Sequence, residues 1–130
     1  MSAISVMLIV TDAEAAVVWY KHALGAKELW NLGGVAGLEV AGAAFFLHEV
    51  NPRNPTETDP QHVGKTSVRI ELFVEDPDAV LERALAAGAT PGSAIEDHET
   101  PWGNHRQGGF KDPFGHNWSV GDTSPLAGRS

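Results

Sequence analysis

The chain has 130 residues, no cysteine and a formal charge of −8, from 9 lysine and arginine residues against 17 aspartate and glutamate residues. Its length is that of one ordinary domain, and a hydrophobic content of 42% supports a buried core without disulfides or metal. The missing cysteines exclude a disulfide framework, a thiolate zinc site and a cysteine nucleophile, and the negative charge argues against nucleic acid as a partner.

The apolar runs of the chain are short. Val6–Val10 is far shorter than a membrane span, and no basic segment of a secretory signal precedes it. Together with the absence of cysteine, this predicts a soluble cytoplasmic protein with no membrane partner.

The first half of the chain has the pattern of a strand, a helix and three more strands. Ser5–Val10 predicts a buried strand, Asp12 an N-cap, and Ala13–Leu24 a helix that ends at Gly25. Three β-like pieces follow, around Lys27–Asn31, Val35–Val40 and Ala44–Val50.

A polar, proline-bearing linker, residues 51–66, separates this half from a second copy of the same pattern. Val68–Val74 predicts a strand, Asp76 a helix cap, and Asp78–Ala87 a helix that ends at Gly88. Three extended pieces complete the second half, at Thr90–Glu96, Gln107–Lys111 and His116–Gly121.

The two halves align with each other. Placing Val10-Thr11-Asp12 on Val74-Glu75-Asp76 also brings Gly25 onto Gly88, once one residue is deleted from the second helix. An internal duplication is the simplest explanation of this self-similarity.

The duplication predicts an α+β fold of two βαβββ modules within one domain, residues 1–130. Neither module covers both faces of its own sheet, so we expect them to pair into a curved sheet around a cleft, within one chain or between two. The predicted divisions are module one at about 4–50, the linker at 51–66, module two at about 67–122 and a loose tail at 123–130.

Trp102–Gly121 concentrates aromatic and polar side chains in one predicted hairpin. Asp112-Pro113-Phe114-Gly115 has turn chemistry, because proline presets φ, glycine tolerates the position that follows, and aspartate bonds back to the backbone. In the next strand Trp118 alternates with Ser119, so we expect Trp118 in the core and Ser119 in the cleft.

The order of these motifs resembles the vicinal oxygen chelate superfamily, which holds glyoxalase I, bleomycin-resistance proteins, extradiol dioxygenases and fosfomycin-resistance enzymes. The resemblance covers Ser5 to Asp122, and its last motif is similar to an uncharacterised glyoxalase-like branch. It implies a homodimer of paired βαβββ modules. The motifs that carry it are Trp19-Tyr20 to Leu24-Gly25, Ala86-Ala87-Gly88-Ala89, and Trp102-Gly103 followed by Asp112-Pro113-Phe114-Gly115-His116.

In metal-using members, the resemblance implies one metal ligand on the first strand and one on the last strand of each module. Ser5, Arg69 and Ser119 stand at three of these positions, and either His48 or Glu49 stands at the fourth. A metal enzyme normally supplies three or more histidine or carboxylate ligands, so we expect no metal cofactor. The alternative is a divalent metal, such as Zn, Ni, Mn or Fe, at an atypical site around His48, Glu49 and the hairpin histidines.

Side-chain alternation selects the residues that line the cleft. The aliphatic residues of the strand at 68–74 must form the core face, so Arg69, Glu71 and Phe73 face the cleft, with a buried or half-buried Arg69–Glu71 pair. Met7 lines the opposite strand by the same reasoning, and Trp102 stands on the rim as a lid. The predicted ligand-binding residues are Ser5, Met7, Arg69, Glu71, Phe73, Trp102 and Ser119.

Such walls suit an aromatic or planar small molecule that carries a polar group. We therefore expect a metal-independent binding protein of the bleomycin-resistance type, for drug or metabolite sequestration, and favour this over an enzyme. The alternatives are a metal-dependent lyase, isomerase or dioxygenase with an atypical site, and a dimerisation module whose cleft is filled by side chains.

Overall fold

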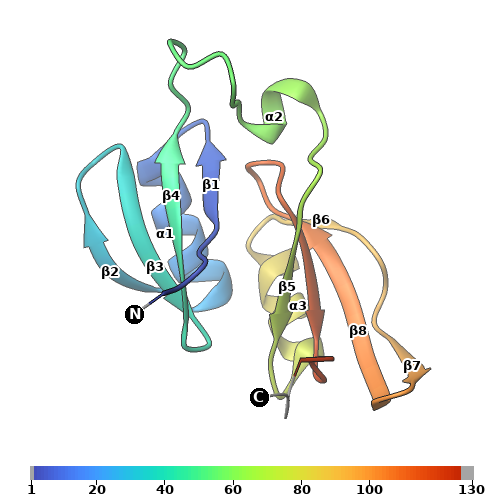
Figure 1. Cartoon of the computed structure of the whole chain (residues 1–130). Helices are drawn as coiled ribbons and strands as arrows, with labels where there is room; N and C mark the ends of the chain where they lie inside the picture. The colour runs from blue at the N-terminus through green and yellow to red at the C-terminus, as the bar shows by residue number, and fades with distance from the viewer. Residues whose placement is uncertain (1, 127–130) are drawn as a thin grey trace.

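The computed structural model describes residues 2–126, and its first half forms a four-stranded sheet with one helix (Figure 1). The strand order is β1-β4-β3-β2, with β1 parallel to β4 and the other pairs antiparallel. The elements are β1 (Met7–Val10), α1 (Ala13–Leu24), β2 (Lys27–Asn31), β3 (Val35–Val40) and β4 (Ala43–Glu49).

The second half repeats this arrangement with a five-stranded sheet. Its order is β5-β9-β8-β6, with β7 also paired to β8 and β5 parallel to β9. The predicted α+β fold of two βαβββ modules is confirmed. The elements are α2 (Pro60–Val63) in the linker, then β5 (Arg69–Phe73), α3 (Pro77–Ala86), β6 (Thr90–Pro91), β7 (Glu96–Thr100), β8 (Gly103–Lys111) and β9 (Asn117–Gly121).

Three predicted strand boundaries are wrong. The piece expected at 90–96 is split between β6 and β7, and β8 begins at Gly103, so that Pro101 and Trp102 form the turn of a β7–β8 hairpin. The segment before position 107 is polar and lacks apolar alternation, so nothing in its pattern marks a strand. In module one the strand begins at Met7, which leaves Ser5 ahead of it.

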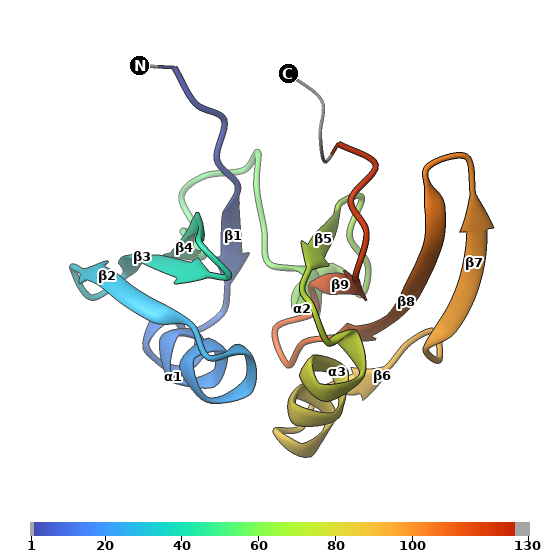
Figure 2. The ribbon, with the colours of Figure 1, turned by 90° about the horizontal axis from the view of Figure 1, so that it is seen from below.

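Helices α1 and α3 lie side by side against one face of the two sheets (Figure 2). The core fills this helix-facing side, and Trp118 is buried there as predicted. Strands β1 and β5 are the neighbouring edges, although among residues 2–126 no ladder joins the two sheets. The opposite face, which we call the open face, curves away from the helices through β8 and β7. Among residues 2–126, no helix is long and apolar enough to span a bilayer.

Local capping explains where the helices begin and end. The Asp12 carboxylate accepts the N–H of Ala15 at 3.0 Å, and the Asp76 carboxylate accepts that of Ala79 at 3.1 Å. Gly25 closes α1 with φ of 66°, a left-handed conformation that glycine adopts at low cost. These predicted caps are confirmed.

Asp112 is the polar centre of the contact between the modules. Its carboxylate is 2% exposed and accepts the backbone N–H groups of Phe114 and His116 at 2.9 and 3.0 Å, and the indole N–H of Trp118 at 2.9 Å. The hydroxyl of Tyr20, on α1 of the other module, also donates to it. The turn that begins at Asp112 is therefore tied to module one as well as to its own strands.

Further bonds join the modules within one chain. The His116 ring donates from Nε2 to the carbonyl of Ile9 on β1 at 2.8 Å. The Trp19 indole N–H donates to the carbonyl of Ala87 at the end of α3 at 2.9 Å. Of the two pairings left open by the sequence, the intrachain one is therefore present.

The single tyrosine of the chain tests the Asp112 contact. Burial, and next the Asp112 carboxylate, raise the pKa of Tyr20 well above its ordinary value of 10.0. The raised pKa stabilises the fold below pH 10.0, and this stability is lost as pH rises further, because only the unfolded chain releases the proton there. We expect tyrosinate absorbance to appear only together with loss of native circular dichroism, whereas the urea-unfolded chain titrates normally. A tyrosinate signal in the still-folded protein would contradict the contact.

Candidate functional site

The open face of module two carries two adjoining hollows, of about 520 Å³ and 480 Å³. His98 of β7 and Gln107 of β8 line both of them. Together the hollows form one groove across β8, which we call the module-two groove. Its polar end contains Arg69, Lys111 and Ser119, and its aromatic end contains Phe73, Trp102 and His105.

Arg69 of the polar end forms an exposed ion pair with Glu71, which lines the aromatic end. Arg69 contacts Oε1 of Glu71 through Nη2 at 2.6 Å and through Nε at 2.8 Å. The Arg69 side chain is 64% exposed and that of Glu71 is 36% exposed. The pair is as predicted, but the Arg69 side chain is more exposed than expected, because within residues 2–126 no strand pairs with the outer edge of β5. Such an exposed pair contributes little to stability and leaves the guanidinium accessible to a ligand.

Ser119 lies at the floor of the polar end. It is 4% exposed because β9 lies between β5 and β8, and its hydroxyl accepts a hydrogen bond from the Gln107 side-chain amide. The sequence did not identify Gln107 as a site residue, because a polar residue in a strand does not reveal which side chain it will bond. The cross-strand register, which sets Gln107 opposite Gly121, brings it diagonally to Ser119.

The aromatic end is built from β5 and from the β7–β8 hairpin with its turn. Phe73 comes from β5, Trp102 from the β7–β8 turn, where it is 45% exposed, and the cross-strand neighbours His98 and His105 from β7 and β8. The Phe73 and His105 rings have centroids 6.2 Å apart. The first residues of the predicted loose tail, 124–126, also line this end, and 127–130 lie outside the described residues.

The ring of His105 occupies the space that a side chain at Gly121, on the neighbouring strand, would take. The residue is 8% exposed, and a Cβ atom at Gly121 would come within 2.5 Å of its Cε1 and 3.1 Å of its Nε2. The imidazole therefore lies over the backbone of β9. Its Nδ1 is buried and has no hydrogen-bond partner among residues 2–126.

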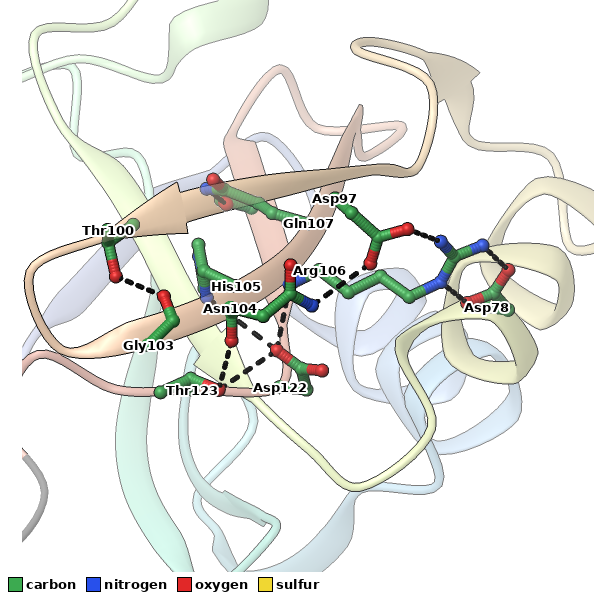
Figure 3. Close-up of polar contacts among 11 residues, drawn as sticks. Asp78, Asp97, Thr100, Gly103, Asn104, His105, Arg106, Gln107, Asp122 and Thr123 are labelled. Carbon is green, nitrogen blue, oxygen red and sulfur yellow. Dashed lines mark hydrogen bonds and ion pairs between the residues drawn. The ribbon is translucent and has the colours of Figure 1, made fainter.

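Asp122 is the nearest carboxylate to that nitrogen, with 3.7 Å between Oδ1 and Nδ1 of His105 (Figure 3). It accepts the backbone N–H of Arg106 at 2.9 Å and the hydroxyl of Thr123 at 3.1 Å. The pKa of Asp122 is lowered, and the hydrogen bond from the Arg106 backbone N–H is the largest cause. Asp122 is therefore ionised at neutral pH.

Arg106 fixes the strands behind the groove. Its guanidinium contacts Asp78 of α3 at 2.7 and 2.8 Å and Asp97 of β7 at 2.9 Å (Figure 3). The hydrogen bonds from Arg106 lower the pKa of Asp78. The network ties β7 and β8 to the helix side, so His98 and His105 are presented together on the open face.

Two predicted site residues lie outside the groove. Ser5 lines a smaller hollow of about 190 Å³ between the edges of β1 and β5, which it shares with Glu71. Met7 is 46% exposed and lines neither end of the groove. Because β1 starts at Met7, Ser5 is beyond the ladder and is not aligned with the other predicted residues.

The residues at the predicted metal positions do not fit a metal centre. His48 donates from Nδ1 to the carbonyl of Glu49 at 2.6 Å, while the Glu49 carboxylate accepts the N–H of Ala13, at the start of α1, at 3.1 Å. Arg69 supplies a cation and Ser119 an engaged hydroxyl. Within the described chain, no three histidine or carboxylate side chains are close enough to share an ion.

Known proteins share this fold. A family model described as the Glyoxalase/Bleomycin resistance protein/Dioxygenase superfamily matches residues 3–120. An uncharacterized protein of Mycobacterium bovis is 39% identical over 127 residues, which cover 92% of this chain and 82% of the relative. TioX from Micromonospora sp. ML1 has a TM-score of 0.72 at 26% identity, covering 94% of this chain and 98% of its own. Fosfomycin resistance protein FosX from Mesorhizobium loti has a TM-score of 0.65 at 15% identity, covering 97% and 96%.

A methyl group at position 121 tests the placement of His105. We expect Gly121→Ala to displace the imidazole and to lower the free energy of unfolding by about 1–3 kcal/mol in urea denaturation. Gly34→Ala is the matched control, since nothing lies within 4 Å of a Cβ atom there. Adding His105→Ala to Gly121→Ala should restore part of the loss. Equal stability of the two single variants would contradict the packing.

Proposed function

Because the chain belongs to the glyoxalase/bleomycin resistance protein/dioxygenase superfamily, we propose that it is a metal-independent binding protein of the bleomycin-resistance type. It holds a small planar aromatic ligand in the module-two groove. Its role is sequestration of a drug or metabolite in the cytoplasm, and it does not transform the ligand.

The division of the groove into an aromatic and a polar end carries this proposal. Phe73 and Trp102 offer ring surfaces for a planar molecule, and an exposed tryptophan at a turn can cover it. Arg69 and Lys111, at the other end, suit an anionic or strongly polar substituent. Mostly apolar walls with a few polar groups are typical of small-molecule sites.

Metal independence is supported by the hydrogen bonds in which the candidate metal ligands are already engaged. The carboxylate of Glu49 bonds the start of α1, and the hydroxyl of Ser119 bonds Gln107. The positively charged guanidinium of Arg69 would repel a metal cation. A ligand would then be held by rings, hydrogen bonds and charge rather than by coordination.

We also propose that the protein forms a homodimer, as its family resemblance implies. The open face of module one exposes Met7 by 46% and Trp30 by 39%, beside the ring of Phe46. A second copy that covered this face would remove the apolar surface from water.

Binding without metal is tested by calorimetry with anthraquinone-2-sulfonate, a planar anionic probe, on protein treated with a chelator. We expect binding, weakened about tenfold by Phe73→Ala or Trp102→Ala through lost ring contacts. Leu32→Ala, which truncates a side chain 78% exposed outside the groove, is the control and should have no effect. Binding that requires added Zn²⁺, Ni²⁺, Mn²⁺ or Fe²⁺ would overturn metal independence and favour an enzyme with an atypical metal site.

The homodimer is tested by sedimentation equilibrium. We expect Trp30→Glu to weaken self-association by about tenfold or more, since a charge would be buried in the contact. Val18→Glu, at a position on α1 that is 63% exposed, should leave it unchanged. A monomer at all concentrations, or equal effects of both variants, would contradict the proposal.

A further inference from the structure

His105 is a buried histidine with one ring nitrogen, Nδ1, that residues 2–126 leave without a hydrogen bond. Buried polar atoms are normally paired, because an unpaired one costs free energy. His105 is 8% exposed, and its Nδ1 has no partner among residues 2–126. The structural histidine of the same hairpin differs, since His116 bonds the Ile9 carbonyl. Nδ1 faces Asp122, which leaves Nε2 as the ring nitrogen that a ligand in the hollow could reach.

The position of the ring favours contact with a bound aromatic molecule. His105 lines the same hollow as Phe73 and Trp102, and its Cε1–Nε2 edge lies over Gly121 on the open face. A planar ligand against Phe73 would therefore bring a ring substituent to the imidazole, because the two rings are only 6.2 Å apart.

The charged groups that face His105 directly are carboxylates. Asp122 faces it from the end of β9, Glu71 lines the same hollow from β5, and His98 lies opposite it on β7. The Arg106 guanidinium is held away from it by Asp78 and Asp97. None of the described residues that line this hollow is lysine or arginine. If the ring takes up a proton from a ligand, both of its nitrogens become donors.

We propose that His105, with Asp122 behind it, binds the acidic hydroxyl of the ligand, so that the groove selects planar aromatic compounds of the phenol class. This inference rests on the proposed function and names its ligand class. When a neutral phenol binds, its O–H bond breaks, an N–H bond forms at Nε2, and a phenolate is paired with the imidazolium. A phenolate that meets protonated His105 gives the same complex, and no further reactant is needed.

Absorbance titration of 4-nitrophenol tests this directly, because its phenolate and phenol have different spectra. In the wild-type complex we expect the apparent pKa of the bound compound to fall by about one unit, since a cation close by stabilises the phenolate. The ring control is 4-nitroanisole, which has no ionisable hydrogen. We expect its binding to be independent of pH in the same range.

Two variants assign the shift to His105. His105→Gln should abolish the shift while 4-nitroanisole still binds. Asp122→Asn keeps an acceptor for the Arg106 N–H but loses the charge, so it should reduce the shift even if His105→Gln fails to fold. His22→Gln, at an exposed position of α1, should retain the full shift.

The outcomes separate this inference from the proposed function. If both compounds bind and 4-nitrophenol titrates as it does free in solution, His105 has no such role, although the groove is a binding site. A shift that persists in His105→Gln has the same meaning. If neither compound binds the wild-type protein, and anthraquinone-2-sulfonate also does not, the proposed function fails and this inference with it.

Discussion

The buried carboxylate of Asp112 holds the two modules in one arrangement. A charge removed from water in this way is tolerated only when donors surround it. Two donors are backbone N–H groups of its own turn, one is the indole of Trp118, and the last is the hydroxyl of Tyr20 from the other module. One side chain therefore shapes the β8–β9 turn and anchors it to α1.

The groove depends on that turn, because the turn sets the register between β8 and β9. The register places Gly109 opposite Ser119 and Gln107 opposite Gly121. These pairs put an amide beside the Ser119 hydroxyl at the polar end and a glycine beneath His105 at the aromatic end. A slip by one residue would exchange the core and open faces of the strand and remove both ends.

The two modules share a fold but differ in chemistry. Only the second extends its sheet through β7, and the Arg106 network holds this strand as one wall of the groove. In the first, Met7 and Trp30 expose apolar surface on the open face, and the Glu49 carboxylate accepts a backbone N–H at the start of α1. Of the positions at which the family resemblance implies metal ligands, those of Arg69, Ser119 and His48 or Glu49 are occupied by residues with other partners. The repeated modules supply the scaffold, and the candidate groove lies on the second of them.

The sequence by itself determined the repeat, the fold class, the caps at Asp12 and Asp76 and the buried place of Trp118. These follow from residues a few positions apart or from alternation along one strand, which are local physical constraints. The tertiary structure alone decided that Ser5 falls outside β1, that Arg69 is exposed and that His105 lies over Gly121. Such facts depend on pairing register and on neighbours distant in the chain, which no local pattern specifies.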